Sequence, residues 1–171
     1  MNHLTDNYLH LILLMKRNAI FSLPIFLAVV LAASLTSSAQ TVSGSIGNGT
    51  VAKGGTARGT IVLSIPGNLH VNSSRPNSEY LIPTSVALST SGGVVVSRVT
   101  YPRGVNRRFQ FSDKPINVYE GTVSFPFTVR VPSNFRGNTV TVNAVVRYQA
   151  CNDEVCFPPR VRNITMTARV R

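Results

Sequence analysis

The sequence predicts an all-β domain of the immunoglobulin-like antiparallel β-sandwich class. Hydrophobic residues make up 43% of the chain and charged residues 13%, which is typical of a folded globular protein. Several short runs alternate apolar and polar residues with a period of two, and turns rich in Gly, Pro, Asn and Ser separate them. The runs carry no helical periodicity, so we expect about seven strands in two packed sheets.

Ahead of these strands, residues 1–39 predict a secretory signal peptide. Basic residues at 16–17 precede an apolar run over 19–35, and small residues at its end suit cleavage after Ala39. Met15 is an alternative start codon, because the residues before it do not look like the basic start of such a peptide. We expect an exported protein, periplasmic or secreted, in a compartment that favours disulfides over free thiols.

An uncleaved membrane anchor is the other interpretation of this segment. The apolar run is about 17 residues long, at the lower limit for a membrane span, and Pro24 interrupts it. The sequence favours cleavage and leaves the anchor open.

The next segment, residues 40–59, is rich in Gly, Ser and Thr, and we expect a flexible segment or an edge strand there, ahead of a domain over 60–171. Strands are predicted where side chains alternate, over 60–66, 84–90, 94–101, 123–131, 140–146 and 162–171. The second and third of these flank Ser91-Gly92-Gly93, which predicts a hairpin.

Residues 102–119 predict a long loop, because they contain Gly, Asp and Pro among polar side chains. Two aromatic residues, Phe109 and Phe111, lie within it. Long loops with apolar residues are more often functional than accidental.

Cys151 and Cys156 are the only cysteines of the chain, with four residues between them. In an exported protein they are expected to form a disulfide. The bond has two interpretations, a structural cross-link or a redox couple. Closing so short a loop restricts the unfolded chain by only about 2 kcal/mol, which leaves both open.

Other chemistry is poorly represented. His70 is the only histidine after residue 39, and two cysteines with one histidine fall short of the four ligands of a structural zinc site. A cysteine hydrolase would need His70 to activate a thiol that has a second thiol close by to pair with. Since the chain also lacks a phosphate-binding loop and a nucleophile elbow, we expect no metal and no cofactor.

Two sequence blocks resemble the N-terminal periplasmic domain family of the thiol:disulfide interchange protein DsbD. The first is RYQACNDEVCFPP at 147–159, in which a second cysteine precedes an aromatic residue and two prolines. The second is PGNLHVNSSRPNSEYLIPTSVAL at 66–88, which is similar to the other recurring block of that family. The blocks occur in the family's order, and the resemblance covers about residues 60–171.

The resemblance implies an immunoglobulin-like fold with a redox pair, Cys151 and Cys156, at one end. It also implies a cap loop over 108–119, in which Phe111 is the expected shield of the disulfide and Phe109 the runner-up. Further residues are expected beside the pair: His70, Asn72, Tyr148 and Phe157.

The family also implies partners. Such a domain accepts electrons from a thioredoxin-like or membrane reductase protein and passes them to oxidised envelope proteins. We expect a stand-alone, monomeric domain whose electron donor is another protein, and leave open whether the chain counts as an oxidoreductase component. A secreted immunoglobulin-like binding module with a structural disulfide is the alternative.

Nucleic acid is not an expected partner, although the formal net charge is +11. The arginines are spread one or two to a strand and do not cluster with aromatic residues, as they would on a nucleic-acid-binding surface.

Overall fold

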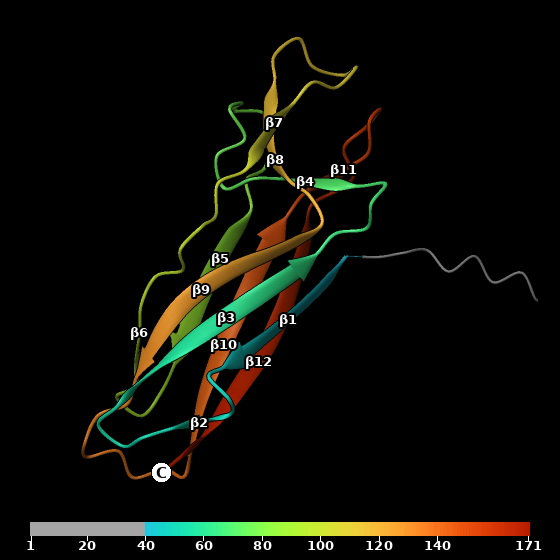
Figure 1. The fold of residues 1–171 in the computed structure, drawn as a ribbon. Coiled ribbons are helices and arrows are strands. Elements are labelled where there is room, and N and C mark those ends of the chain that lie inside the picture. The colour runs from blue at the N-terminus through green and yellow to red at the C-terminus, as the bar shows by residue number, and fades with distance from the viewer. Residues whose placement is uncertain (1–39) are drawn as a thin grey trace, which may run out of the picture. The chain divides into compact units, whose positions relative to one another are not determined.

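The computed structural model describes residues 40–171, so the predicted signal peptide lies outside the described residues. This part of the chain is all-β, with twelve strands in three four-stranded sheets (Figure 1). It contains no helix long and apolar enough to cross a membrane. The predicted fold class, an immunoglobulin-like sandwich, is confirmed.

The first two sheets form the sandwich. The first has the order β1 (Thr41–Ile46), β3 (Thr56–Ser64), β9 (Thr122–Arg130) and β6 (Val95–Val96). The second has the order β2 (Thr50–Val51), β12 (Arg160–Val170), β10 (Thr139–Tyr148) and β5 (Ser85–Thr90). Strand pairs are antiparallel except for β2 and β12, which are parallel.

A third sheet lies at the end of the sandwich where β5 begins and β10 ends (Figure 1). Its order is β11 (Ala150–Cys151), β4 (His70–Asn72), β8 (Ile116–Tyr119) and β7 (Val105–Arg107). Only one residue, Gln149, separates β11 from β10, so the cysteine motif continues a long central strand of the neighbouring sheet.

The core lies between the first two sheets, and the alternation read from the sequence is confirmed there. In β9 and just beyond it, every second residue from Val123 to Val131 is buried, and in β10 every second residue from Val140 to Val146 is buried. Met166 and Ala168 of β12 face the same cluster. Because apolar side chains on alternate positions face one way, the two sheets bury them against each other.

The hairpin predicted over 84–101 is wrong. β5 pairs with β10 and β6 pairs with β9, so the turn at Gly92 and Gly93 carries the chain from one sheet to the other. Both glycines have positive φ, 68° and 75°, which side chains disfavour. Alternation identifies a buried face but does not identify the partner strand.

The strand predicted to continue to residue 101 stops after Val96. Thr100 donates its N–H to the carbonyl of Pro126 at 2.8 Å, so the polar backbone groups of residue 126 face this side. Proline has no N–H to donate in return. The ladder between β6 and β9 is therefore incomplete at this point.

The loop predicted over 102–119 is also wrong in part, because β7 and β8 pair within it as a hairpin. Ile116 and Val118 are buried on β8, a two-residue alternation too short to stand out among polar neighbours. Residues 102–104 and residues 108–115, the latter at the tip of this hairpin, are without strand pairing.

Residues 40–59 contribute to the sandwich. β1 pairs along β3 in register from Thr41 with Ser64 to Ile46 with Gly59, and β2 pairs with the end of β12. Ile46 and Val51 are buried in the core.

Two valines of β10 provide a matched test of this packing. Val142 is fully buried, and Val145 is 44% exposed on the outer face of the same strand. We expect Val142→Ala to lower the free energy of unfolding by about 2 kcal/mol, because it removes two buried methyl groups and leaves a cavity. Val145→Ala should cost less than about 1 kcal/mol. Urea unfolding measures both, and equal losses would contradict the sandwich assignment.

Candidate functional site

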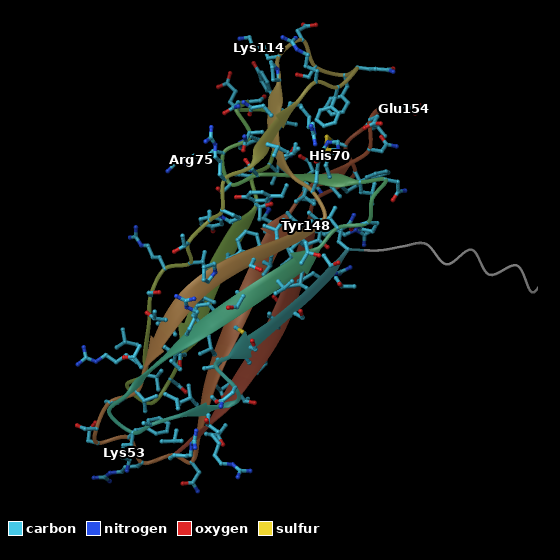
Figure 2. All side chains as sticks on the ribbon, in the orientation of Figure 1. Lys53, His70, Arg75, Lys114, Tyr148 and Glu154 are labelled. Carbon is cyan, nitrogen blue, oxygen red and sulfur yellow. A yellow bond between two sulfur atoms is a disulfide. The ribbon has the colours of Figure 1, made fainter. Side chains whose placement is uncertain are left out.

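Cys151 and Cys156 form a disulfide that closes a tight hairpin (Figure 2). The sulfur–sulfur distance is 2.03 Å and the Cα atoms are 3.9 Å apart. Asn152 organises the turn, because its Oδ1 accepts hydrogen bonds from the N–H groups of Glu154 (2.9 Å) and Val155 (2.7 Å). Asn152 N–H donates to the Val155 carbonyl at 3.0 Å. The sequence folds into this turn because an asparagine side chain stabilises it locally.

The two cysteines differ in access to solvent. Cys151 lies on β11 and is 0% exposed, whereas Cys156 is partly exposed. Phe157 N–H donates to the Ala150 carbonyl at 2.8 Å, which holds the chain after Cys156 against β11. Of the two cysteines, Cys156 is therefore the one that a reagent arriving from solvent meets first.

His70 is the cross-strand partner of Cys151 in the pairing of β11 with β4. Residues directly opposite in an antiparallel pair point to the same face, with Cβ atoms about 4.5–5.5 Å apart. His70 is buried, and the ring of Phe109 stacks on its imidazole with a centroid distance of 4.0 Å and an interplanar angle of 11°. The disulfide and the imidazole thus lie together at the end of the domain (Figure 2).

Phe109 makes this contact, and Phe111 lies beside it. Their rings are stacked with centroids 5.3 Å apart. Phe109 also lines a groove with His70 and Asp153, the latter from the turn between the cysteines. The structure thus brings both predicted cap residues to the site, and of the two it is Phe109 that contacts His70. That Phe111 shields the disulfide stays a prediction.

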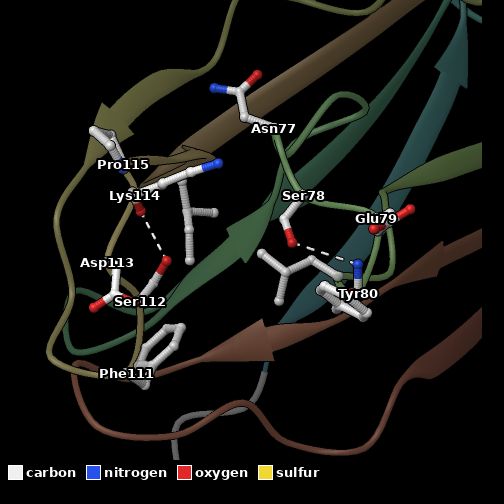
Figure 3. A pocket seen from close by; sticks show the side chains of 11 residues that line it. Asn77, Ser78, Glu79, Tyr80, Phe111, Ser112, Asp113, Lys114 and Pro115 are labelled. Atoms are coloured by element: carbon white, nitrogen blue, oxygen red, sulfur yellow. Dashed lines mark hydrogen bonds between the residues drawn. The ribbon is translucent and has the colours of Figure 1, made fainter.

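Phe111 faces a second hollow, between residues 77–81 and 111–116 (Figure 3). Two local hydrogen bonds shape its walls: Ser112 Oγ donates to the Lys114 carbonyl at 2.8 Å, and Tyr80 N–H donates to Ser78 Oγ at 3.4 Å. Tyr80, from the second resemblance block, is 88% exposed beside it.

Asn72 and Gln149 join the elements around the disulfide. The Nδ2 of Asn72, which is fully buried, donates to Gln149 Oε1 at 2.9 Å and to the Ile82 carbonyl at 3.1 Å. Gln149 Oε1 also accepts from Ile82 N–H at 3.2 Å, and Gln149 Nε2 donates to the Phe157 carbonyl at 3.2 Å. One side chain therefore links β4, the segment before β5 and the residue after Cys156.

Tyr148 and Phe157 flank the cysteine hairpin in different ways. Tyr148 is fully buried at the end of β10, and its hydroxyl has no hydrogen-bond partner among residues 40–171. Phe157 is 38% exposed. Of the two, Tyr148 belongs to the packed support and Phe157 presents an apolar surface next to Cys156.

Burial and the nearby carboxylates have opposite effects on the pKa of His70. Burial lowers the pKa of His70 below its usual value, and the carboxylates of Asp153 and Glu120 act in the opposite direction. Glu120 is itself paired with Arg107, whose Nε and Nη2 donate to the two carboxylate oxygens at 2.9 and 2.8 Å. This hydrogen-bonded pair lowers the pKa of Glu120, but both side chains are exposed enough that the pair adds little stability.

Sequence reasoning missed Gln149 and the Arg107–Glu120 pair. Gln149 lies within the cysteine block, two residues before Cys151, and this proximity was the signal available in the sequence. In the structure it lies between β10 and β11. The ion pair joins residues 13 apart in a segment predicted as loop, and only the β7–β8 hairpin brings them together. Within residues 40–171, no group of three or more His, Cys, Asp or Glu is placed to hold a metal ion.

The model of the family described as "Thiol:disulfide interchange protein DsbD, N-terminal" matches residues 50–168. Among curated proteins, none matches the sequence.

Among solved structures, the N-terminal periplasmic domain of ScsB from Proteus mirabilis is similar, with a TM-score of 0.47 and 11% identity, over 76% of this chain and 45% of that one. A family 123 glycoside hydrolase from Clostridium perfringens has a TM-score of 0.27 and 12% identity, over 75% of this chain and 27% of that one. This chain therefore spans less than half of either.

The lowered pKa of His70 predicts a pH dependence of folding stability. Between the folded and the unfolded pKa of His70, the unfolded chain binds more protons, so stability present above about pH 6.5 is lost as the pH falls through this window. In His70→Gln this contribution disappears. We expect the unfolding free energy of the native chain, relative to that of the variant, to fall between pH 7.5 and 5.5, as measured by urea titration. A difference that is constant with pH, or that rises as the pH falls, would contradict the shift.

Proposed function

We propose that this chain, which belongs to the family of the N-terminal domain of the thiol:disulfide interchange protein DsbD, exchanges disulfides with thioredoxin-like partners through Cys151 and Cys156. The resemblance drawn from the two sequence blocks is confirmed by the family match over residues 50–168. The observation that carries the proposal is the unequal exposure of the two bonded cysteines.

The exchange follows from this inequality. A partner thiolate attacks the sulfur of Cys156, the Cys151–Cys156 bond breaks, and Cys151 leaves as a thiolate that takes up a proton. A second thiol of the partner then attacks the mixed disulfide, which releases Cys156. Two electrons pass to this chain and the partner is left with a disulfide. The reverse sequence reduces an oxidised acceptor.

A purely structural bond is a weaker explanation of the same geometry. The hairpin that it closes is already held by the backbone hydrogen bonds of Asn152 and Phe157 and by the Asn152 side chain. Loop closure over so few residues contributes only about 2 kcal/mol. A cross-link within one hairpin also joins no distant strands, so its presence is better explained by exchange.

Partners and location come from the family. We place the chain in the periplasm, where a thioredoxin-like or membrane reductase protein supplies electrons and oxidised envelope proteins receive them. The apolar surface of Phe157 beside Cys156 suits contact with such a protein.

The order of attack can be tested by trapping. The full chain with Cys151→Ala, reduced beforehand, is mixed with a thioredoxin-like protein that has a single active-site cysteine linked to thionitrobenzoate. Cys156 should displace thionitrobenzoate and hold the partner in a mixed disulfide, seen as a reducible band of higher mass in a non-reducing gel. The matched variant is Cys156→Ala, whose remaining cysteine is buried and should react far more slowly. Trapping only by Cys156→Ala would reverse the assignment, and trapping by neither would favour the binding module.

The cap can be tested by replacing each phenylalanine in turn. We expect Phe109→Ala to speed reduction of the disulfide by dithiothreitol, because the ring stacked on His70 restricts access from that side. Phe111→Ala is the matched control and should have the smaller effect, because Phe111 stacks on Phe109. The release of thiols, followed by quenched-flow alkylation, gives both rates. Unchanged rates in both variants would remove the cap and leave the redox pair untouched.

A further inference from the structure

Within the part of the chain that the structure describes, three buried polar atoms near the disulfide have no hydrogen-bond partner: His70 Nε2, Asn72 Oδ1 and Tyr148 Oη. A buried polar group without a partner costs about 1–3 kcal/mol, so each such group calls for an explanation. His70 stands apart, because its direct cross-strand partner is Cys151.

In the tautomer with the proton on Nδ1, the Nε2 atom of His70 is an acceptor, and the oxidation state of Cys151 explains why this acceptor lacks a donor. In the disulfide the sulfur of Cys151 carries no hydrogen, whereas the reduced cysteine carries an S–H group that can donate. Since opposite residues share a face of the sheet, reduction supplies a donor on the side of His70.

We propose that His70 is the proton acceptor for Cys151 when this cysteine resolves a mixed disulfide held on Cys156. The proposal rests on the exchange function proposed above, and it specifies how the buried cysteine, Cys151, loses its proton in that exchange. It makes His70 a participant in the reaction, beyond its place beside the pair.

The step balances as follows. The S–H proton of Cys151 passes to the unpartnered nitrogen of His70 while the sulfur attacks Cys156, a new Cys151–Cys156 bond forms, and the partner leaves as a thiolate. His70, now an imidazolium, later releases its proton to water. In the reverse direction, the imidazolium returns a proton to Cys151 as it leaves.

Burial makes this assistance necessary. The thiolate is the attacking species in exchange, and an apolar site without water disfavours it. Cys151 is 0% exposed, so solvent hydroxide has poor access to its proton. A positioned base inside the site removes that limit.

The charged groups that face His70 suit a base that is neutral at pH 7. They are Asp153 from the cysteine turn, Glu120 after β8, Arg107 on β7 and Arg108 in the tip loop. Arg107 is committed to Glu120. Burial keeps the pKa of His70 low enough for the neutral form to dominate, and Asp153 limits that lowering so that the ring can still accept a proton.

The test uses the reduced full chain and excess 5,5′-dithiobis(2-nitrobenzoate), an aromatic disulfide. Cys156 releases the first thionitrobenzoate and forms a mixed disulfide, and Cys151 releases the second as it closes the native bond. Stopped-flow absorbance separates the two phases. The rate constant of the second phase is measured from pH 5 to 9.

In the native chain we expect this rate constant to reach a plateau above the pKa of His70. In His70→Gln the plateau should be lost, and the rate should climb by about tenfold per pH unit with the thiolate fraction. At pH 7.5 the variant should be slower by about 100-fold. The same profile in both proteins would overturn the proposal.

Two further variants separate proton transfer from packing. Phe109→Leu removes the ring stack but keeps the imidazole, so the plateau should remain, and its loss there would assign the effect to the stack and overturn the proposal. Asp153→Asn removes a carboxylate that raises the pKa of His70, so the acid edge of the plateau should move to lower pH. An unmoved edge would overturn the proposal.

Failure of the proton transfer to His70 can be distinguished from failure of the proposed exchange function. A chain that traps a partner through Cys156 but shows no plateau disproves only the proton transfer. A chain that shows the plateau but traps no partner disproves only the exchange with thioredoxin-like proteins.

Discussion

The pairing of β11 with β4 is the constraint on which the rest of the site depends. It places Cys151 inside the third sheet, opposite His70, while the turn led by Asn152 returns the chain so that Cys156 stays near solvent. Six consecutive residues thereby form a disulfide between one buried and one partly exposed cysteine. The chemistry proposed for the chain, including the roles of its two cysteines, follows from this asymmetry.

The sandwich supplies a rigid support for that pairing. β10 extends from the core directly into the cysteine motif, so the buried strand positions β11 with only Gln149 between them. Gln149 in turn binds Asn72 and Ile82, which ties β11 to the elements beside it. By contrast, the tip of the β7–β8 hairpin lacks strand pairing and contributes the phenylalanines. The strands that support the disulfide are thus part of the regular sheets, whereas the predicted cap residues lie in a segment without strand pairing.

Sequence patterns predicted the sandwich because its core strands are long and alternate clearly, as in the run from Val123 to Val131. The predictions failed where the structure depends on contacts between residues distant in sequence. The hairpin assigned to residues 84–101 was wrong because alternation does not choose a partner, and Pro126 ends the β6 ladder from a distant strand. Similarly, the cysteine block pointed to the site, but the stacking of Phe109 on His70 depends on how the 108–115 tip folds back, which no local pattern encodes.

The reduction potential of the Cys151–Cys156 bond tests the central claim most directly. The full chain is equilibrated with dithiothreitol or glutathione buffers of known potential, and the reduced fraction is read by thiol alkylation and mass measurement. If the pair exchanges with thioredoxin-like partners, the potential should lie well above about −300 mV, within reach of such proteins. A potential below about −300 mV, the range of structural disulfides, would contradict the account.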